Sequence, residues 1–129
     1  MVGSFDNSGS PTIEIEVSGW NVNTRRSFTA IVDTGFTGFL LLPILSAFPV
    51  GLILHTTMGI TLADGSTQNK LACLGGIHFE GQSEVGVIIV EEQNTDVLVG
   101  MEFLKSFKLK LTVDAVAGIL QLEPNQTSM

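Results

Sequence analysis

The sequence predicts a single domain built mostly from β-strands, arranged as a small barrel or a sandwich. Short apolar runs, many of them alternating with polar residues, are separated by turn-forming residues along most of the chain. Only one segment has good helical spacing, and no repeat of about 20–50 residues is present. The length of 129 residues fits one domain. We expect a flexible leader over residues 1–11, the domain over 12–123 and a tail over 124–129.

The first two strands are expected on either side of a polar turn. In TIEIEVSG, residues 12–19, isoleucine and valine alternate with glutamate, which is typical of a strand with one solvent-exposed face. Residues 20–26 are rich in asparagine and arginine and form the predicted turn. The apolar run 28–32 is the second strand, and it ends at Asp33.

Glycine and proline divide the next apolar segment. The chain is expected to turn at Gly35 and Gly38, and the run 39–42 then forms a short, fully apolar strand. Pro43 ends that strand, so residues 44–48 have room for one short helical turn.

A hairpin is predicted in the middle of the chain. Residues 58–63 and 67–74 flank the sequence ADGS, in which Asp64-Gly65 is a strong hairpin signal because both positions tolerate positive φ. We expect Gly75-Gly76 to break the second strand and residues 77–79 to resume it.

The C-terminal half contains the most apolar strand and the only predicted helix. The β-branched run 85–90 is expected to be a central strand that is buried on both faces, and 97–99 is a further short strand. In GMEFLKSF, residues 100–107, the two phenylalanines share a helical face. Residues 108–114 alternate as a strand, and DAVAG turns the chain into a last strand at 119–122.

Composition excludes several functions. The net charge is −7, with 6 basic against 13 acidic residues, so the chain has no electrostatic footprint for nucleic acid. The only cysteine, Cys73, allows no intrachain disulfide, which points to a reducing compartment, and we expect a cytoplasmic protein. His55 and His78 lack neighbours at metal-ligand spacing, so neither a metal nor another cofactor is expected.

One uncharged segment is long enough to be considered as a membrane span. Residues 34–54 carry no charge, and about 20 apolar residues are needed to cross a bilayer. Glycine and proline interrupt the run, however, and no basic cluster flanks it. Buried strands and turns of a compact core also explain the missing charge, and we expect no membrane association.

The sequence VDTGFTGFLLLP, residues 32–43, places one carboxylate in this apolar setting. Asp33 follows a strand, and the glycines after it permit a tight turn whose backbone N–H groups can approach the carboxylate. Such a partly buried acid is suited to chemistry. The residues alone favour an aspartate that caps its own turn and a Thr34 hydroxyl that bonds a nearby carbonyl.

Three motifs in order resemble the retropepsin-like aspartic proteases. IVDTGFTGFLLLP is similar to the active-site loop of that family, LADGST lies where the family has its flap hairpin, and DVLVGMEFL is similar to its second signature, two apolar residues and glycine before a short helix. The resemblance covers roughly residues 12–123, and suggests a small single-domain member of prokaryotic type. It implies an all-β, retropepsin-like half-barrel with a flap and one short C-terminal helix.

A family member of this length carries one catalytic aspartate, so the resemblance implies a homodimer in which Asp33 meets its own copy. By the same resemblance, Thr34 bonds across the dimer axis and the Gly35 amide approaches the carboxylate. The remaining support residues pack behind the loop, where they are equally explained as plain core: Leu98, Val99 and Gly100.

The flap would fold over an extended peptide and exclude water. Asp64 departs from the family pattern, since it places a charge near a tip that is mainly glycine and apolar in retroviral members. Phe36 also departs, because many members have alanine there, and it would narrow a pocket if it faced the cleft. The substrate-contacting residues expected from the resemblance are Phe36, Leu62, Ala63, Asp64, Gly65 and Ser66.

The function we expect is an aspartic endopeptidase that hydrolyses extended peptides through an aspartate pair and an activated water, without a cofactor. The alternative is a catalytically idle module that uses the same fold to dimerise or to bind a peptide.

Overall fold

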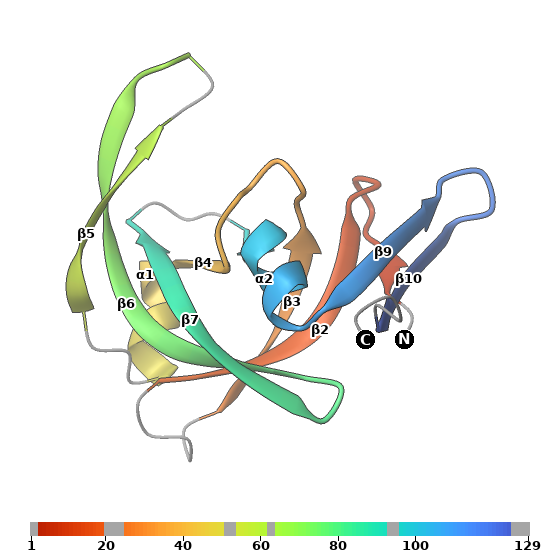
Figure 1. The fold of residues 1–129 in the computed structure, drawn as a ribbon, viewed down its shortest axis with the longest axis horizontal. Coiled ribbons are helices and arrows are strands. Elements are labelled where there is room, and N and C mark those ends of the chain that lie inside the picture. The colour runs from red at the N-terminus through yellow and green to blue at the C-terminus, as the bar shows by residue number, and fades with distance from the viewer. Residues whose placement is uncertain (1–2, 20–24, 51–53, 62–63, 93–95, 125–129) are drawn as a thin grey trace.

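A computed structural model describes residues 3–19, 25–50, 54–61, 64–92 and 96–124. Strands dominate it, and the all-β expectation is confirmed (Figure 1). The elements in chain order are β1 (Ser4–Phe5), β2 (Pro11–Ser18), β3 (Arg26–Val32), β4 (Leu40–Pro43), α1 (Ile44–Ala47), the 3₁₀ helix η1 (Phe48–Val50), β5 (Leu54–Thr61), β6 (Thr67–Phe79), β7 (Gln82–Glu91), β8 (Leu98–Val99), α2 (Met101–Ser106), β9 (Leu109–Asp114) and β10 (Ile119–Pro124).

The main sheet closes on itself, so the barrel alternative is the correct one. Its strand order is β1-β2-β3-β8-β4-β7-β6-β5, and β2 also pairs with β6. The first part of β2 pairs with β3, and its end continues onto β6, where Val17 lies opposite Ile77. Closure gives each of the six strands in the ring a partner on both sides along part of its length.

A crossing in the chain order positions the loop after β3. Strands β3 and β4 follow each other in sequence, but β8 lies between them in the sheet. Val99 of β8 is opposite Val32 in a parallel pair and opposite Leu40 in an antiparallel pair. The loop between β3 and β4 must therefore pass around the end of β8, next to Gly100.

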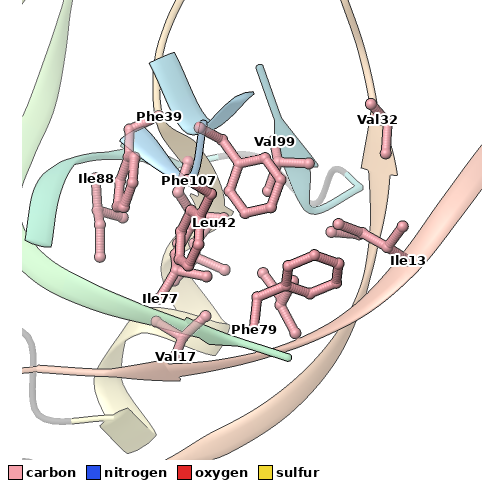
Figure 2. Packing of buried hydrophobic residues seen from close by; sticks show 14 of the residues in the cluster. Ile13, Val17, Val32, Phe39, Leu42, Ile77, Phe79, Ile88, Val99 and Phe107 are labelled. Carbon is pink, nitrogen blue, oxygen red and sulfur yellow. The ribbon is translucent and has the colours of Figure 1, made fainter. Parts of the chain in front are cut away.

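Apolar side chains from the barrel strands and α2 form one core (Figure 2). Val17, Leu42, Ile77 and Val99 have no exposed surface. The ring of Phe79 makes edge contacts with the rings of Phe103, in α2, and Phe107, just after α2. The ring centroids are 5.6 and 6.1 Å apart, respectively. Burying one such large side chain stabilises the fold by about 1.5–3 kcal/mol, so this core holds the barrel together.

The expected break at Gly75-Gly76 was wrong, because β6 runs without interruption through both glycines. Gly76 lies opposite Val85 of β7 and opposite Ser18 of β2, where the barrel closes. A Cβ on Gly76 would come within 3.1 Å of Ser18 Oγ. Glycine at this position allows two strands to approach closely rather than ending one.

The expectation that residues 85–90 are buried on both faces holds only for their second half. β7 is central, between β4 and β6, and Ile88, Ile89 and Val90 are buried. Val85 and Val87, however, are 73% and 37% exposed. Toward the β6–β7 turn one face of the strand lies on the outside of the barrel, so its valines contact solvent.

Both ends of the described chain pack against the domain. Within the expected leader, β1 pairs with β2, and the Gly3 amide donates a hydrogen bond of 3.1 Å to the Leu120 carbonyl of β10. Strands β9 and β10 form a separate antiparallel hairpin that projects from the barrel (Figure 1).

The uncharged run 34–54 is distributed over a loop, β4, α1, η1 and the start of β5. Among the described residues, no helix is long and apolar enough to cross a membrane. The strand and the short helical turn expected here are present, and the turn continues as η1.

Candidate active site

Asp33 is the first residue after β3, in the loop that rises between β3 and β4 (Figure 1). Its amide donates to the Val99 carbonyl at 2.9 Å, and its carbonyl accepts from the Phe36 amide at 3.1 Å. The first bond ties the loop to β8, and the second closes a turn. The carboxyl group is thus presented half-buried, on a backbone fixed at both sides.

The carboxylate of Asp33 is oriented by the turn that follows it. The Gly35 amide donates to Asp33 Oδ1 at 2.9 Å. A Cβ on Gly35 would come within 3.2 Å of that oxygen, which is tighter than an ordinary contact. Hydrogen bonds from N–H groups to a carboxylate are among the stronger ones in proteins, so this bond fixes the direction of the acid. Thr34, between the two, is exposed.

Gly100 lets the start of α2 support the loop from behind. The Met101 amide donates to the Phe36 carbonyl at 2.9 Å, and the Glu102 amide lies 3.1 Å from the Gly38 carbonyl. These are N–H groups of the first helical turn, which have no partner within the helix. A Cβ on Gly100 would lie 2.2 Å from the Phe36 carbonyl oxygen, so only glycine fits. Leu98 and Val99 form β8, which directly precedes Gly100, and Val99 is fully buried.

Phe36 folds back over its own loop. Its ring lies 2.5 Å from the position of a Cβ on Gly38 and 2.7 Å from that of a Cβ on Gly100. The side chain is partly buried. The structure therefore places the ring against two glycines of the loop and its support, and the small residues at 38 and 100 provide the space for it. Sequence reasoning missed this role of Gly38.

The expected flap is the β5–β6 hairpin, which rises from the barrel on the same side as the loop that carries Asp33 (Figure 1). Gly65 at its turn has φ +87°, a conformation that favours glycine. Asp64 Oδ1 accepts hydrogen bonds from the Ser66 hydroxyl at 2.6 Å and the Ser66 amide at 2.9 Å. These bonds lower the pKa of the exposed Asp64 carboxyl below its usual value. Leu62 and Ala63 lie outside the described residues.

A cavity beside Thr34 was not anticipated from the sequence. It has a volume of about 600 Å³, and its apolar lining comes from α2 and β9. No motif could have revealed it, because Thr34 meets α2 and β9 only in the fold. It is lined in part by Thr34, Met101, Leu104, Leu109 and Leu111.

His78 and Cys73 have structural surroundings away from the Asp33 loop. His78 Nε2 is 2.8 Å from Ser18 Oγ, and His78 Nδ1 is 2.6 Å from Ser83 Oγ, which links β2, β6 and β7 where the barrel closes. Cys73 is buried, and burial raises the pKa of its thiol to about 11. Within the described residues, no group of three or more His, Cys, Asp or Glu side chains could hold a metal ion.

Solved structures of two proteases share this architecture. EIAV protease in complex with the inhibitor HBY-793 superposes with a TM-score of 0.65 over 85% of this chain and 99% of its own, at 14% sequence identity. A retropepsin-like aspartic protease from Rickettsia conorii superposes with a TM-score of 0.61 over 93% of this chain and 86% of its own, at 18% identity.

No family model matches the sequence, and no curated protein is significantly similar to it. The likeness therefore lies in the three-dimensional structure, and at these identities it establishes the fold. The chain has the fold of the retropepsin-like aspartic proteases.

Proposed function

We propose that the protein is an aspartic endopeptidase whose active site forms from two copies of the chain. The observation that carries this proposal is the setting of Asp33: a carboxylate directed by the Gly35 amide, on a loop held by β8 and α2. The fold shared with two proteases supports it. A simple turn cap would not need this support from a distant part of the chain.

A second carboxylate is needed because one aspartate cannot act as acid and base at the same time. A two-fold axis beside the exposed Thr34 would bring the Asp33 side chains of two chains together. Two close carboxylates do not both ionise readily, so the pair holds one proton and titrates as a unit. One member is then a base and the other an acid at the same pH.

The reaction proceeds through a water molecule between the two acids. The ionised Asp33 removes a proton from the water, whose oxygen attacks the carbonyl carbon of the peptide, while the protonated Asp33 donates to the carbonyl oxygen. The tetrahedral intermediate collapses when the C–N bond breaks. The amine leaves with the proton that one Asp33 took from the water, and a hydroxyl of the intermediate returns its proton to the other Asp33 as the carbonyl re-forms. No bond forms between enzyme and substrate. Proton transfer of this kind contributes roughly 10² to 10⁴ in rate.

The substrate would be a peptide in extended form, lying under the β5–β6 hairpin. The hairpin, with Gly65 in its turn, would close over the peptide and exclude water. Asp64, Gly65 and Ser66 would then lie nearest to it. Because the chain has a single cysteine and no disulfide is possible within it, we place this activity in the reducing cytoplasm.

The substitution Asp33→Asn tests the proposal, because it removes the acid and keeps its size. We expect cleavage of a peptide library to fall by at least about 10²-fold while the unfolding temperature stays close to the parent value. The matched control is Asp96→Asn, an exposed aspartate shortly before β8, which should leave cleavage unchanged. Cleavage at the parent rate by a folded Asp33→Asn protein would refute the proposal. A chain that binds peptides but never cleaves them would instead be the idle module.

A further inference from the structure

One part of β7 has a neighbouring strand on one side only. β7 pairs with β6 from Gln82 to Val90, but its pairing with β4 begins at Ile88. The strand therefore continues beyond β4 to the β6–β7 turn (Figure 1). Within the described residues, no strand lies along the other side of the segment 82–87, which we call the free edge of β7.

The free edge presents main-chain hydrogen-bonding groups. A two-residue loop, Glu80-Gly81, closes the hairpin of β6 and β7 with φ values of 50° and 77°. The residues that flank such a loop exchange both main-chain hydrogen bonds, and bonded and non-bonded pairs then alternate along the ladder. The N–H and C=O groups of Ser83 and Val85 therefore point away from β6. An extended segment of another chain can pair with all four groups.

The side chains beside the free edge are apolar and exposed. Val85 is 73% exposed and Val87 is 37% exposed, on the outer face of the barrel. Leu74 of β6 lies opposite Val87 and is 40% exposed. Natural edge strands are often protected by lysine, proline or a bulge, and the segment 82–87 contains none of these.

A groove with room for a further strand follows the free edge. It has a volume of about 370 Å³, and its lining comes from β7, from α2 and from the two residues before β4. A strand placed in it would continue the line of β4 along β7. The groove is lined in part by Gly38, Phe39, Val85, Val87, Glu102 and Ser106.

The charges of this surface are negative. A second groove, of about 310 Å³, shares Val85 with the first and includes Glu84 in its lining, while Glu102 lines the first groove. Among the described residues, neither groove is lined by lysine or arginine. Lys105 lies 3.7 Å from Glu102, but both side chains are more than half exposed, so this ion pair is weak. The net charge of −7 adds to the attraction for a basic partner.

We propose that the free edge of β7 is a docking site, to which a basic, extended segment of a partner protein adds as a further strand. Side chains alternate between the two faces of a strand. Apolar residues of the partner at every second position would pack beside Val85 and Val87, and a lysine or arginine between them would face Glu84. A second copy of this chain fits the site poorly, because it adds its own net charge of −7.

This inference goes beyond the proposed function, because it does not involve Asp33. The carboxylate of Glu84 also has a role in it. A charge within an edge strand discourages pairing with another strand of the same charge. Glu84 would thus protect the free edge from other copies of this acidic chain and still admit a basic segment.

Amide hydrogen exchange, followed by NMR, tests the edge residue by residue. In the chain alone, the amide of Val85 should exchange fast, whereas that of Glu84 points to β6 and should be protected. The probe is a seven-residue peptide in which valine alternates with lysine, added to the full-length Asp33→Asn chain so that no cleavage occurs. At ten times its Kd, the peptide should slow exchange of the Ser83 and Val85 amides about 10-fold and leave Glu84 unchanged.

Substitutions at the exposed valine test the same contact by affinity, measured from the fluorescence anisotropy of the labelled peptide. Val85→Lys should weaken binding by at least about 10-fold, because it opposes the lysines of the peptide. The matched control is Leu45→Lys, which changes another exposed apolar residue, on α1, and should bind like the parent. Val85→Pro removes an N–H that makes no bond to β6, so it should also weaken binding while the unfolding temperature stays near the parent value.

Charge is tested separately from the main chain. A peptide with glutamate in place of lysine should bind at least about 10-fold more weakly to the parent chain. Combining Glu84→Gln with Glu102→Gln should reduce this preference, and Glu123→Gln, at an exposed position of β10, should not.

Several results would overturn the docking site. These are a Val85 amide already protected in the chain alone, a lysine peptide that does not bind at about 1 mM, and binding that is unchanged in Val85→Lys. Protection by the peptide at the β5–β6 hairpin instead of at Ser83 and Val85 would place it in the proposed substrate cleft. Self-association of the chain that protects these two amides would make a second copy the occupant. Equal binding of the glutamate peptide would refute the basic partner.

Discussion

The Gly35 amide lies 2.9 Å from Asp33 Oδ1 and donates a hydrogen bond to it. A side chain at Gly35 would be unfavourable, because its Cβ would come within 3.2 Å of that oxygen. The backbone at Gly35 and the carboxylate of Asp33 are thus in close contact. Direction and position of the acid both depend on this contact, so small changes at Gly35 should affect chemistry before they affect folding.

Gly35→Ala should lower kcat for peptide cleavage by about 10- to 100-fold, because displacing a catalytic group by less than 1 Å has effects of this order. The unfolding temperature should change little, since Gly35 is exposed. Thr37→Ala, which shortens an exposed side chain in the same loop, is the control and should keep the parent kcat. An unchanged kcat in Gly35→Ala would show that the orientation of this carboxylate is unimportant.

Gly100→Ala should damage the fold itself. A Cβ there would overlap the Phe36 carbonyl oxygen at 2.2 Å, and this oxygen already accepts the Met101 amide. Overpacking of this kind typically costs about 1–3 kcal/mol. Urea unfolding should show a lower midpoint than the parent chain, and a parent-like midpoint would mean that the loop and α2 are not held together as described.

Acid should weaken the closure of the barrel through His78. Burial and, to a smaller extent, Arg25 lower the pKa of His78, while Glu16 opposes them. Because the folded pKa lies below the unfolded value, the unfolded chain binds the proton more readily. The contribution of His78 is therefore fully present above about pH 6.5 and is lost as the pH falls through the folded pKa.

The change in the free energy of unfolding between pH 7.5 and pH 5 measures this effect. We expect His78→Gln to show a smaller loss than the parent chain over that range, since it cannot titrate. His55 is present in both proteins and cancels in the comparison. Equal losses in the two proteins would exclude His78 as the source.

Asp64 should influence which peptides are cleaved. The hydrogen bonds from Ser66 hold its pKa below the usual value, so it stays ionised in mildly acidic solution. If the β5–β6 hairpin closes over the substrate, peptides with lysine or arginine near the cleaved bond should be preferred over those with glutamate. Asp64→Asn keeps an oxygen for both Ser66 donors and removes the charge.

We expect Asp64→Asn to reduce the ratio of kcat/KM values for basic over acidic peptides, with a parent-like unfolding temperature. Asp114→Asn is a useful comparison, because that aspartate also accepts an amide in a hairpin turn, at the other hairpin. An unaltered ratio in Asp64→Asn would show that the charge in the β5–β6 turn does not influence which peptides are cleaved.

Local patterns predicted much of the fold. Alternation over residues 13–17 and the Asp64-Gly65 pair identified strands and a hairpin that the structure contains. The apolar strand before Asp33 is likewise present as β3. These features depend on neighbours in sequence, which is why pattern reasoning finds them.

The features that were predicted wrongly or missed depend on contacts between segments that are distant in sequence. Gly75-Gly76 was expected to end a strand, because the closure of β6 on β2 cannot be read from β6 alone. The exposure of Val85 depends on which face of β7 the barrel covers. The insertion of β8 between β3 and β4, and with it the contact of Gly100 with Phe36, needed the three-dimensional structure.

The central claim is that two chains each contribute Asp33 to one active site. It is tested most directly by titrating a fixed amount of parent chain with Asp33→Asn chain and measuring peptide cleavage after the subunits have exchanged. If the site needs both acids, mixed dimers are inactive, and a ninefold excess of the variant should leave about a tenth of the activity. If cleavage stays constant throughout the titration, each chain works without the acid of another and the two-chain site is wrong.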